Sequence, residues 1–525
     1  MYLRQKCKCI PKLSHLIESS RPTVKQSSQP TCALQFIHTC DHRSKNANIL
    51  QIKNNKEKNV DNNNSQRNTF SNSLGFILAA AGSAVGLGNI WRFPYLAAKD
   101  GGGIFLLVYI ILALTFGFAL LISEIAIGRK TKESPLTAYK KINKHWAFIG
   151  IFSYAVPLII YPYYCVIGGW VLKYAACYFA FQADSATEAG FFTSFITNPY
   201  QAILYCAIFA ILCFIIVYKG VEKGIEKYSR ILMPALAVMV VLIAIYSLFI
   251  KHTDANGVTR TGLQGAAIYF IPNFKGLTFV KFLTVCLDAM GQLFYSLSIA
   301  MGIMVAYGSY MKDDVNLGKS VNRIEIFDTG IALLAGLMII PAVYVFNGVE
   351  GMSAGPSLMF ISMPNIFASL GKPGAVLGMI FFLMVLFAAL TSSVSILEAI
   401  VSSMIDKFKW SRKKASMIMA GIEFIVSIIV CLGYNIFYFE LKLPNGSVGQ
   451  ILDLFDYASN NILMPLVALF TCILIGWVAK PKTITDEICK NGEVFRRKLL
   501  YTIMIKFVAP ILLFILLLFS IGVFN

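Results

Sequence analysis

Long runs of apolar residues, separated by short polar segments, fill the chain from about residue 70 to its end. Runs such as Ile104–Ile122, Leu232–Ile250 and Ile503–Phe524 approach or exceed the roughly 20 residues that a helix needs to cross about 30 Å of hydrocarbon. The strands of an outer-membrane barrel would instead show short segments of alternating polarity. The pattern therefore predicts an all-α membrane protein.

The apolar runs predict about eleven transmembrane helices. Their expected spans are 70–95, 101–127, 147–178, 199–218, 222–250, 282–310, 322–347, 371–408, 413–434, 449–477 and 498–524. Two connections between them are long: 251–281, which contains Pro272, and 348–370, which contains Pro356 and Pro364. Connections of this length often hold short helices that act as lids.

The 525 residues are 57% hydrophobic and 14% charged, and they carry a formal net charge of +19. Lysine and arginine cluster in alternate connections, at Arg129–Lys144, Lys219–Arg230, Lys312–Arg323, Lys407–Lys414 and Lys480–Lys498. By the positive-inside rule these connections are cytoplasmic. The charge therefore indicates membrane topology rather than nucleic-acid binding, with the N-terminus in the cytoplasm and the C-terminus outside.

Residues 1–66 differ in composition from the rest of the chain. They are rich in Asn, Lys, Ser and Gln, and they lack the apolar segment of a signal peptide. We expect a disordered cytoplasmic extension here. A start codon assigned too far upstream is the alternative interpretation. In either case, residues 67–525 are expected to form one transmembrane domain.

Two predicted spans contain glycine and polar residues at membrane depth. The first contains Gly82–Asn89, followed at once by Trp91–Pro94, and the sixth contains Gly291, Gln292 and Ser296–Gly302. Such residues can be simple helix-packing surfaces. Their recurrence five spans apart is, however, typical of discontinuous helices in two inverted repeats, which surround a midplane site. Free N–H groups at such a break suit a carboxylate, and free carbonyls suit a small cation.

The run Gly82–Pro94 closely resembles the signature of the first helix of the neurotransmitter:sodium symporter family, whose bacterial members have the LeuT-type fold. Over about residues 67–524, further family motifs recur in order at Gly101–Gly103, Glu124, Tyr163–Tyr164, Gln292–Gly302, Leu390–Ser393 and Leu452–Asp456. The resemblance implies a 5+5 inverted repeat with helices 1 and 6 unwound at the midplane. Repeat one would cover about 70–250 and repeat two about 282–477, with an extra helix at 498–524.

The resemblance also implies two sodium sites built from oxygen atoms, which suit an alkali cation. The first would use the Ala84 carbonyl, the side chains of Asn89, Ser296 and Asp328, and the substrate carboxylate, which would couple ion to substrate. The second would use the carbonyls of Gly82, Val85 and Ala388 and the hydroxyls of Thr391 and Ser392. Taken alone, these two hydroxyls could instead bond to a carbonyl of their own helix.

An amino acid would lie between the broken helices, as the same resemblance implies. Its carboxylate would meet N–H groups near Leu87 and Gly88 and the Tyr164 hydroxyl, and its amino group would meet carbonyls including those of Tyr295 and Ser298. Its side chain would occupy a pocket lined by Ser83, Ile160, Tyr295, Met301, Ser392 and Ile396. Because this lining carries no charge, the expected substrates are neutral, apolar or aromatic amino acids.

Ionisable residues inside membrane spans are functional by default. Arg92 and Asp456 match the family's extracellular gate, with Tyr295 as its aromatic lid, and Arg67 and Asp406 match the intracellular gate. A solvated position in the N-terminal extension is the alternative interpretation of Arg67.

One position departs from the family pattern. The usual Asn of the seventh span aligns with Asp328, and the Ser of chloride-dependent members aligns with Ala332, although Tyr109, Gln292 and Ser296 of the chloride site are present. A fixed carboxylate beside the first sodium would supply the negative charge that chloride otherwise brings. The resemblance therefore predicts chloride independence, with proton uptake and release by Asp328 as a further hypothesis.

Together these features predict a sodium-coupled symporter that imports neutral amino acids by alternating access, with two sodium ions, no organic cofactor and no enzymatic activity. Its expected partners are the amino acid and the lipid bilayer of a plasma (inner) membrane. A homodimer stays open as an alternative to a monomer. A membrane sensor that binds an amino acid without transporting it is the competing function, whereas an ion channel would need a continuous polar pore.

Overall fold

The computed structural model describes residues 69–523, except 255, 256, 275, 349, 350, 352–354 and 445. The expectations for residues 1–66 and for Arg67 therefore lie outside the described residues. The chain divides into two units, Met1–Arg67 and Asn68–Asn525, and everything below concerns the second.

Within the described residues, nine helices are long and apolar enough to cross a membrane. In chain order they are α4 (Gly103–Leu112), η2 (Ala113–Gly117) and α5 (Phe118–Thr131); η3 (Lys144–Trp146) and α7 (Phe148–Phe179); α9 (Pro199–Tyr218); η5 (Val221–Glu226) and α10 (Lys227–Phe249); α14 (Leu317–Asn347); α16 (Lys372–Phe408); α17 (Arg412–Leu432); α18 (Ile451–Asp456), η8 (Tyr457–Leu463), α19 (Met464–Ile473) and η9 (Leu474–Val478); and α21 (Lys498–Ile503), η10 (Met504–Val508) and α22 (Ala509–Ser520). The predicted all-α membrane architecture is confirmed.

The two spans that sequence reasoning expects to be interrupted are interrupted. In the first, α2 (Ser73–Ala84) is bent by 54° against the segment formed by η1 (Gly88–Arg92) and α3 (Phe93–Lys99). In the sixth, α12 (Phe279–Ser296) is separated from α13 (Ile303–Ser309) by a non-helical connection. The bent pair raises the candidate spans among the described residues to ten, so the count of eleven stays a prediction.

Short elements fill the connections. They are α6 (Pro135–Ile142), η4 (Asp184–Thr187), α8 (Phe191–Thr197), α11 (Gly262–Phe270), η7 (Leu358–Ser362), α15 (Met363–Ser369), α20 (Lys482–Ile488), the antiparallel hairpin β1 (Lys251–Thr253) and β2 (Thr259–Thr261), and the antiparallel hairpin β3 (Leu441–Lys442) and β4 (Val448–Gly449). Short helices do occupy the two long connections, as predicted, but the two hairpins were not foreseen.

The start of the seventh helix was predicted too late, at residue 322. The helix begins at Leu317 because the Asn316 side chain accepts a hydrogen bond from the Lys319 backbone N–H at 2.7 Å and caps the first turn. The prediction used the apolar run alone and overlooked this polar first turn.

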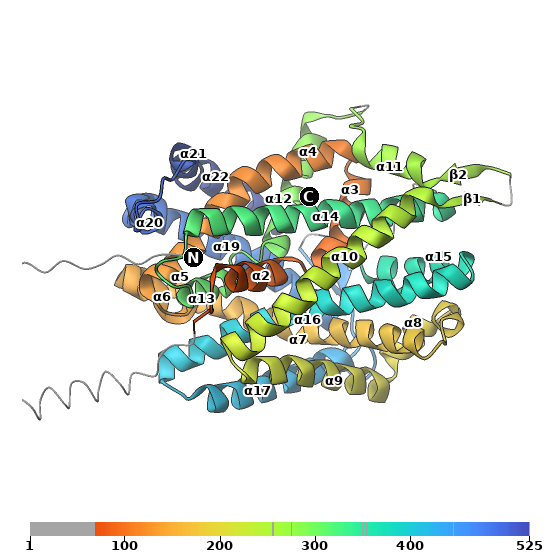
Figure 1. The fold of residues 1–525 in the computed structure, drawn as a ribbon, viewed down its shortest axis with the longest axis horizontal. Coiled ribbons are helices and arrows are strands. Elements are labelled where there is room, and N and C mark those ends of the chain that lie inside the picture. Colours follow the sequence, from red (N-terminus) through yellow and green to blue (C-terminus); the bar gives the residue numbers. More distant parts are fainter. Residues whose placement is uncertain are drawn as a thin grey trace, which may run out of the picture. The chain divides into compact units, whose positions relative to one another are not determined.

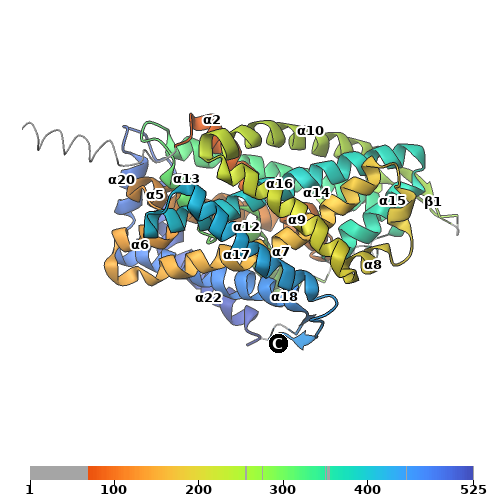
Figure 2. The same cartoon turned by 90° about the horizontal axis from the view of Figure 1, so that it is seen from below.

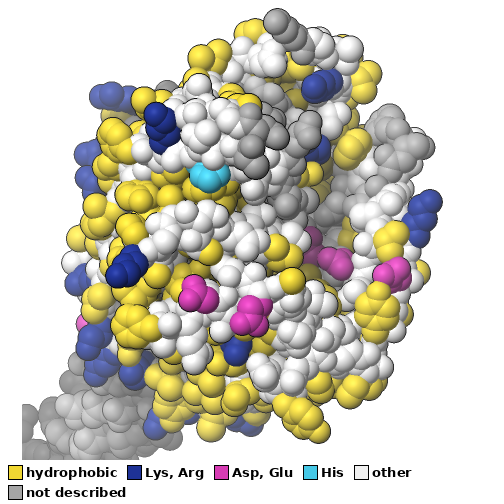
Figure 3. Space-filling view, turned by 90° about the vertical axis from the view of Figure 1, so that its right-hand side faces the viewer, with side chains coloured by type: hydrophobic (Ala, Val, Ile, Leu, Met, Phe, Trp, Pro, Cys, Tyr) yellow, Lys and Arg dark blue, Asp and Glu magenta, His cyan; other side chains and the backbone are white. Residues whose placement is uncertain are grey.

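The long helices lie side by side along one common direction (Figures 1 and 2). The elements that carry or border the five basic connections, such as α6, α20 and the start of α17, lie at one end, on the left in Figure 1, whereas α8, α11 and α15 lie at the other. In Figure 3 the end that carries α8, α11 and α15 faces the viewer. On this end, acidic side chains lie near the middle and several basic ones lie nearer the edge. The basic segments thus gather on one side of the bundle, as a membrane topology requires.

The second half of the broken sixth span is held in place by close backbone contact between α13 and α5. A Cβ added at Gly128 would lie 2.0 Å from the Val305 carbonyl oxygen, and one added at Gly308 would lie 2.3 Å from the Ile125 carbonyl oxygen. Only glycine permits this approach on both sides, which is the small-residue packing that membrane helices use. The contact fixes α13 directly beyond the break.

Candidate functional site

The break in the first span leaves backbone groups that bond to two neighbouring helices, α7 and α12. Helix α2 ends because Val85 adopts an extended conformation (φ −75°, ψ 95°). Beyond it, the Leu87 N–H donates to the Tyr164 hydroxyl of α7 at 3.2 Å, and the Gly88 carbonyl accepts from the Gln292 amide of α12 at 3.1 Å. The predicted carboxylate-binding groups, Leu87 and Tyr164, are therefore brought together.

A small cavity lies between the two breaks. It is lined by Ser83, Gly86, Ile160, Tyr164, Tyr295, Ser298, Met301, Ser392 and Ile396. All six side chains of the predicted substrate pocket are in this lining, and none of the nine lining residues is charged. The cavity encloses only about 10 Å³, room for about one water molecule, so an amino acid enters only if the lining moves.

Sequence reasoning placed Gly86 in the break of the first span but did not name it as a residue of the pocket. A Cβ at this position would lie 2.8 Å from the Ser392 hydroxyl and 2.9 Å from the Tyr164 hydroxyl, so the glycine leaves the space in which these two groups meet. Its position between Gly82 and Gly88 was the available signal.

The predicted first sodium site forms a compact buried cluster. The Asn89 amide donates to the Ser296 hydroxyl at 3.1 Å and to one Asp328 carboxylate oxygen at 2.9 Å, and the Ser296 hydroxyl donates to the other at 2.7 Å. Tyr109, which was assigned to the chloride site, donates to Ser296 at 3.1 Å. Asn89, Ser296 and Asp328 are all 0% exposed, so a carboxylate stands beside the break, where its charge is poorly screened.

The predicted second sodium site joins the eighth span to the first. The Ser392 hydroxyl lies 3.4 Å from the Gly82 carbonyl oxygen and 3.4 Å from that of Val85, and 3.1 Å from that of Ser83. The Thr391 hydroxyl bonds within its own helix, to the carbonyls of Phe387 at 2.9 Å and of Ala388 at 3.1 Å. Carbonyl and hydroxyl oxygens from two helices thus meet here, the donor set that suits an alkali cation.

A chain of serine hydroxyls connects the two breaks and was not foreseen in full. Ser395 donates to the Ser83 hydroxyl at 2.7 Å, and Ser298 donates to the Ser83 carbonyl at 2.9 Å. Ser395 lies one residue before Ile396 on α16, and its ordinary appearance in an apolar helix gave no signal.

Glu124 supports the break in the sixth span from α5. Its carboxylate accepts the Ala300 backbone N–H at 2.7 Å, and both Ala300 (φ 62°) and Ser298 (φ 51°) adopt the left-handed conformation that non-glycine residues rarely take. The contact therefore satisfies a buried donor that the broken helix leaves without a helical partner.

Replacing Glu124 with Leu should destabilise the protein relative to Glu124→Gln, which keeps an acceptor oxygen. Leaving the Ala300 N–H unsatisfied costs about 1–3 kcal/mol. We expect a lower melting temperature for the Leu variant in detergent micelles. Equal melting temperatures for the two variants would show that this hydrogen bond does not support the break.

Three predicted gate residues are described, Arg92 in η1 and Asp456 in α18 toward one end of the bundle and Asp406 in the last turn of α16, whereas Arg67 lies outside the described residues. The Arg92 guanidinium lies against α12, 3.3 Å from where a Cβ at Gly291 would be, and the Asp456 carboxylate accepts from the Asn460 amide. Among the described residues, Arg92 and Asp456 form no ion pair within 4.0 Å. At the other end, the Asp406 carboxylate accepts the Ser134 N–H at 2.6 Å. The pairing of these gates stays a prediction.

A buried ion pair near the intracellular gate was missed. Arg412, at the start of α17, lies 2.7 Å from the Glu398 carboxylate, whose other oxygen accepts from the Tyr310 hydroxyl at 2.5 Å. Glu398 is an ionisable residue inside the eighth span, which was the available signal.

Asp100 lies outside the spans, in the connection between α3 and α4, and is 5% exposed. Burial, followed by the negative charge of Asp288, raises the pKa of Asp100 from 3.8 to about 7. Asp288 itself pairs with Lys99 at 2.9 Å.

The raised pKa of Asp100 predicts a pH dependence of stability. An unfolded Asp ionises near pH 3.9, so the stability that the neutral folded form contributes is lost as the pH rises through about 7. The melting temperature should therefore fall more between pH 5 and pH 9 in the wild type than in Asp100→Asn. Parallel pH profiles for the two proteins would contradict the assignment.

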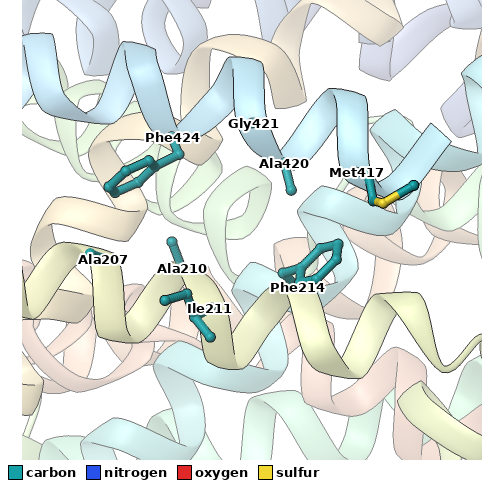
Figure 4. Close-up of a pocket in the computed structure, with 8 residues that line it drawn as sticks. All are labelled: Ala207, Ala210, Ile211, Phe214, Met417, Ala420, Gly421 and Phe424. Atoms are coloured by element: carbon teal, nitrogen blue, oxygen red, sulfur yellow. The ribbon is translucent and has the colours of Figure 1, made fainter. Parts of the chain in front are cut away.

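A second cavity, between α9 and α17, does not suit a zwitterion. It is lined by Ala207, Ala210, Ile211, Phe214, Met417, Ala420, Gly421 and Phe424 (Figure 4). Apart from the weakly accepting sulfur of Met417, none of these side chains can donate or accept a hydrogen bond, so they are poorly suited to orient an amino or carboxylate group. The cavity between the breaks is therefore the candidate site.

Comparisons with known proteins agree with this geometry. A profile described as the sodium:neurotransmitter symporter family matches residues 67–189 and 192–525. The chain is 33% identical over 464 residues to "uncharacterized sodium-dependent transporter YhdH" of Bacillus subtilis, covering 87% of this chain and 98% of that protein. It is 26% identical over 486 residues to human "sodium- and chloride-dependent GABA transporter 2", covering 82% and 76%.

The fold also matches a solved structure. The crystal structure of MhsT in complex with L-phenylalanine superposes with a TM-score of 0.76 and 34% sequence identity, covering 86% of this chain and all of that one. This match confirms the predicted LeuT-type fold, and the relatives are sodium-dependent transporters rather than enzymes. The chain is thus a multi-pass, sodium-coupled membrane transporter of a small molecule, and it belongs to the sodium:neurotransmitter symporter family.

Proposed function

We propose that this transporter imports neutral amino acids, apolar or aromatic, together with sodium and without chloride. The observation that carries the proposal is the buried cluster of Asn89, Ser296 and Asp328 beside an uncharged cavity. The cluster supplies a fixed negative charge where a sodium ion would bind, and the cavity offers no partner for a charged side chain.

The groups around the cavity suit the two ends of an amino acid. The Leu87 N–H and the Tyr164 hydroxyl, which lie 3.2 Å apart, would bind the carboxylate, and carbonyls at the breaks, including those of Tyr295 and Ser298, would accept from the amino group. Ile160, Met301 and Ile396 supply apolar surface for the side chain. The phenylalanine in the MhsT complex is an amino acid of the proposed class.

Two sodium ions would accompany each amino acid. One would bind at Asn89, Ser296, Asp328 and the Ala84 carbonyl, and the other at the carbonyls of Gly82, Val85 and Ala388 with Thr391 and Ser392. At about 100 mV, two charges provide roughly 4.6 kcal/mol, on the order of a thousandfold accumulation. The carboxylate of Asp328 would replace the charge that chloride brings elsewhere.

Alternating access would open the site to each side in turn. Spans 1, 2, 6 and 7 would rock against the rest of the bundle, with Arg92, Asp456 and Tyr295 closing the outer path and Arg67 and Asp406 the inner one. The basic connections would face the cytoplasm, which places the N-terminus inside and the C-terminus outside.

A binding assay with purified protein tests the substrate class. Neutral apolar and aromatic amino acids should raise the melting temperature in sodium gluconate, because a ligand at 100 times its Kd stabilises the folded state by about 2.7 kcal/mol. Glutamate, lysine and potassium gluconate serve as controls. Equal stabilisation by the charged amino acids, or stabilisation that does not need sodium, would overturn the proposal.

A further inference from the structure

A basic cavity lies between the tenth and eleventh spans, away from the transport site. It encloses about 560 Å³ and is lined by Gly476, Trp477, Lys480, Pro481, Lys482, Thr485, Asp486, Lys498, Thr502 and Lys506. Four of the lining residues are lysines and only Asp486 is acidic, so the cavity carries a net positive charge. Its elements, η9, α20 and α21 with η10, lie at the end of the bundle where the basic connections gather (Figure 1).

The position of Lys506 is unusual for a solvated lysine. Lys498, Thr502 and Lys506 recur at four-residue intervals, so they lie along one face of the eleventh span. Lys506 therefore lies about 12 Å deeper along the helix than Lys498. Among the described residues, none of the four lysines of the cavity forms an ion pair. A lysine at this depth needs an anionic or aromatic partner.

Aromatic side chains hold Lys506 at the rim of the cavity. Its ammonium lies 5.0 Å from the centre of the Trp477 ring and 5.9 Å from that of Phe507, and the Trp477 indole donates to the Lys506 carbonyl at 3.1 Å. These contacts join the two spans and keep the charge beside the apolar surface.

The adjoining surface is apolar and open. Ile503 directly follows Thr502, Phe507 directly follows Lys506, and Ile511 lies four residues further along the helix; they are 43%, 49% and 60% exposed. Trp477 is 54% exposed beside them. A polar, positive cavity at the end of the spans thus continues into an exposed apolar face, which matches a molecule with an anionic head and hydrocarbon chains.

We propose that this cavity binds the phosphate headgroup of an anionic phospholipid, whose acyl chains lie along the face formed by Ile503, Phe507 and Ile511. Lys480, Lys482, Lys498 and Lys506 contact the phosphate, and Thr485 and Thr502 lie among them as hydroxyl donors. Basic cavities between membrane helices on the cytoplasmic side are suited to such headgroups. The lipid binds independently of the amino acid, since none of these residues lines the transport site.

Trp477 provides a direct reporter of the bound lipid. The full-length protein is placed in phosphatidylcholine nanodiscs that contain increasing fractions of dibrominated phosphatidylglycerol, and the quenching of Trp477 is taken as the difference between wild type and Trp477→Phe. Dibrominated phosphatidylcholine measures non-specific contact. We expect half-maximal quenching at a lower fraction of phosphatidylglycerol than of phosphatidylcholine.

Charge-neutralising variants separate a site from a general surface effect. Lys498→Gln with Lys506→Gln should weaken the preference for phosphatidylglycerol about fivefold per lysine. The matched control, Lys144→Gln with Lys413→Gln, removes the same charge from exposed lysines at the same end of the bundle and should keep the preference. Lys144, Lys413 and Lys498 are exposed and Lys506 is half-buried, so equal melting temperatures are required to verify that each variant folds.

Three results would overturn the proposal. One is equal quenching by the two brominated lipids, and another is an equal loss of preference in the control variant. The third is displacement of phosphatidylglycerol by millimolar inorganic phosphate, which would identify a site for soluble phosphate compounds instead of a lipid.

Discussion

Asp328→Asn is expected to lower sodium-driven amino-acid uptake about 100-fold in chloride-free medium. The substitution keeps the size of the side chain but removes the negative charge that faces the proposed first sodium ion beside Asn89 and Ser296. Breaking a buried charge pair costs about 3–5 kcal/mol. A loss of only about 2.7 kcal/mol would already weaken sodium binding about 100-fold, and uptake driven by sodium should fall with it. Uptake of radiolabelled substrate into proteoliposomes measures the effect.

Asp313→Asn is the matched control for the loss of a carboxylate. Asp313 is half exposed and pairs with Lys132 at 2.7 Å and with Lys490 at 2.9 Å, so its removal should change uptake little. Adding Ala332→Ser to Asp328→Asn should restore part of the uptake when chloride is present. Normal chloride-free uptake by Asp328→Asn would show that this carboxylate does not replace chloride.

Gly86→Ala is expected to weaken substrate binding by a factor of about 5 to 150. The added methyl group would lie 2.8 Å from the Ser392 hydroxyl and 2.9 Å from that of Tyr164, where the amino acid must fit. Displacing these packed groups costs about 1–3 kcal/mol, which corresponds to a factor of about 5 to 150. Equilibrium binding of labelled substrate in sodium gluconate measures the change.

Gly421→Ala controls for the glycine substitution itself. A Cβ at Gly421, on α17, meets no atom within 4 Å, so the same added methyl group should leave binding unchanged. If Gly86→Ala binds the substrate with wild-type affinity, the substrate does not lie against Gly86 and the proposed site is wrong.

The sequence predicts most of the helices because a membrane span is a local feature. Continuous apolar runs identify the spans, and the glycines at Gly82, Gly86 and Gly88 signal the first break. Local patterns also have limits: the Asn316 cap was overlooked, and the start of α14 was placed five residues too late.

The rest of the site depends on contacts between distant segments. Ser395 meets Ser83 across 312 residues of chain, and Glu124 meets Ala300 across 176. No periodicity in either segment encodes these contacts. The site residues named from the sequence came instead from the resemblance to a family, and Ser395 and Glu398, which were missed, lie outside the motifs that carry this resemblance.

The account is tested most directly by uptake of a neutral amino acid into proteoliposomes with an inward sodium gradient and chloride replaced by gluconate. We expect accumulation above the external concentration that needs sodium and does not change when chloride is restored. Saturable binding without accumulation under any ion gradient would contradict transport, and it would instead favour a membrane sensor of amino acids.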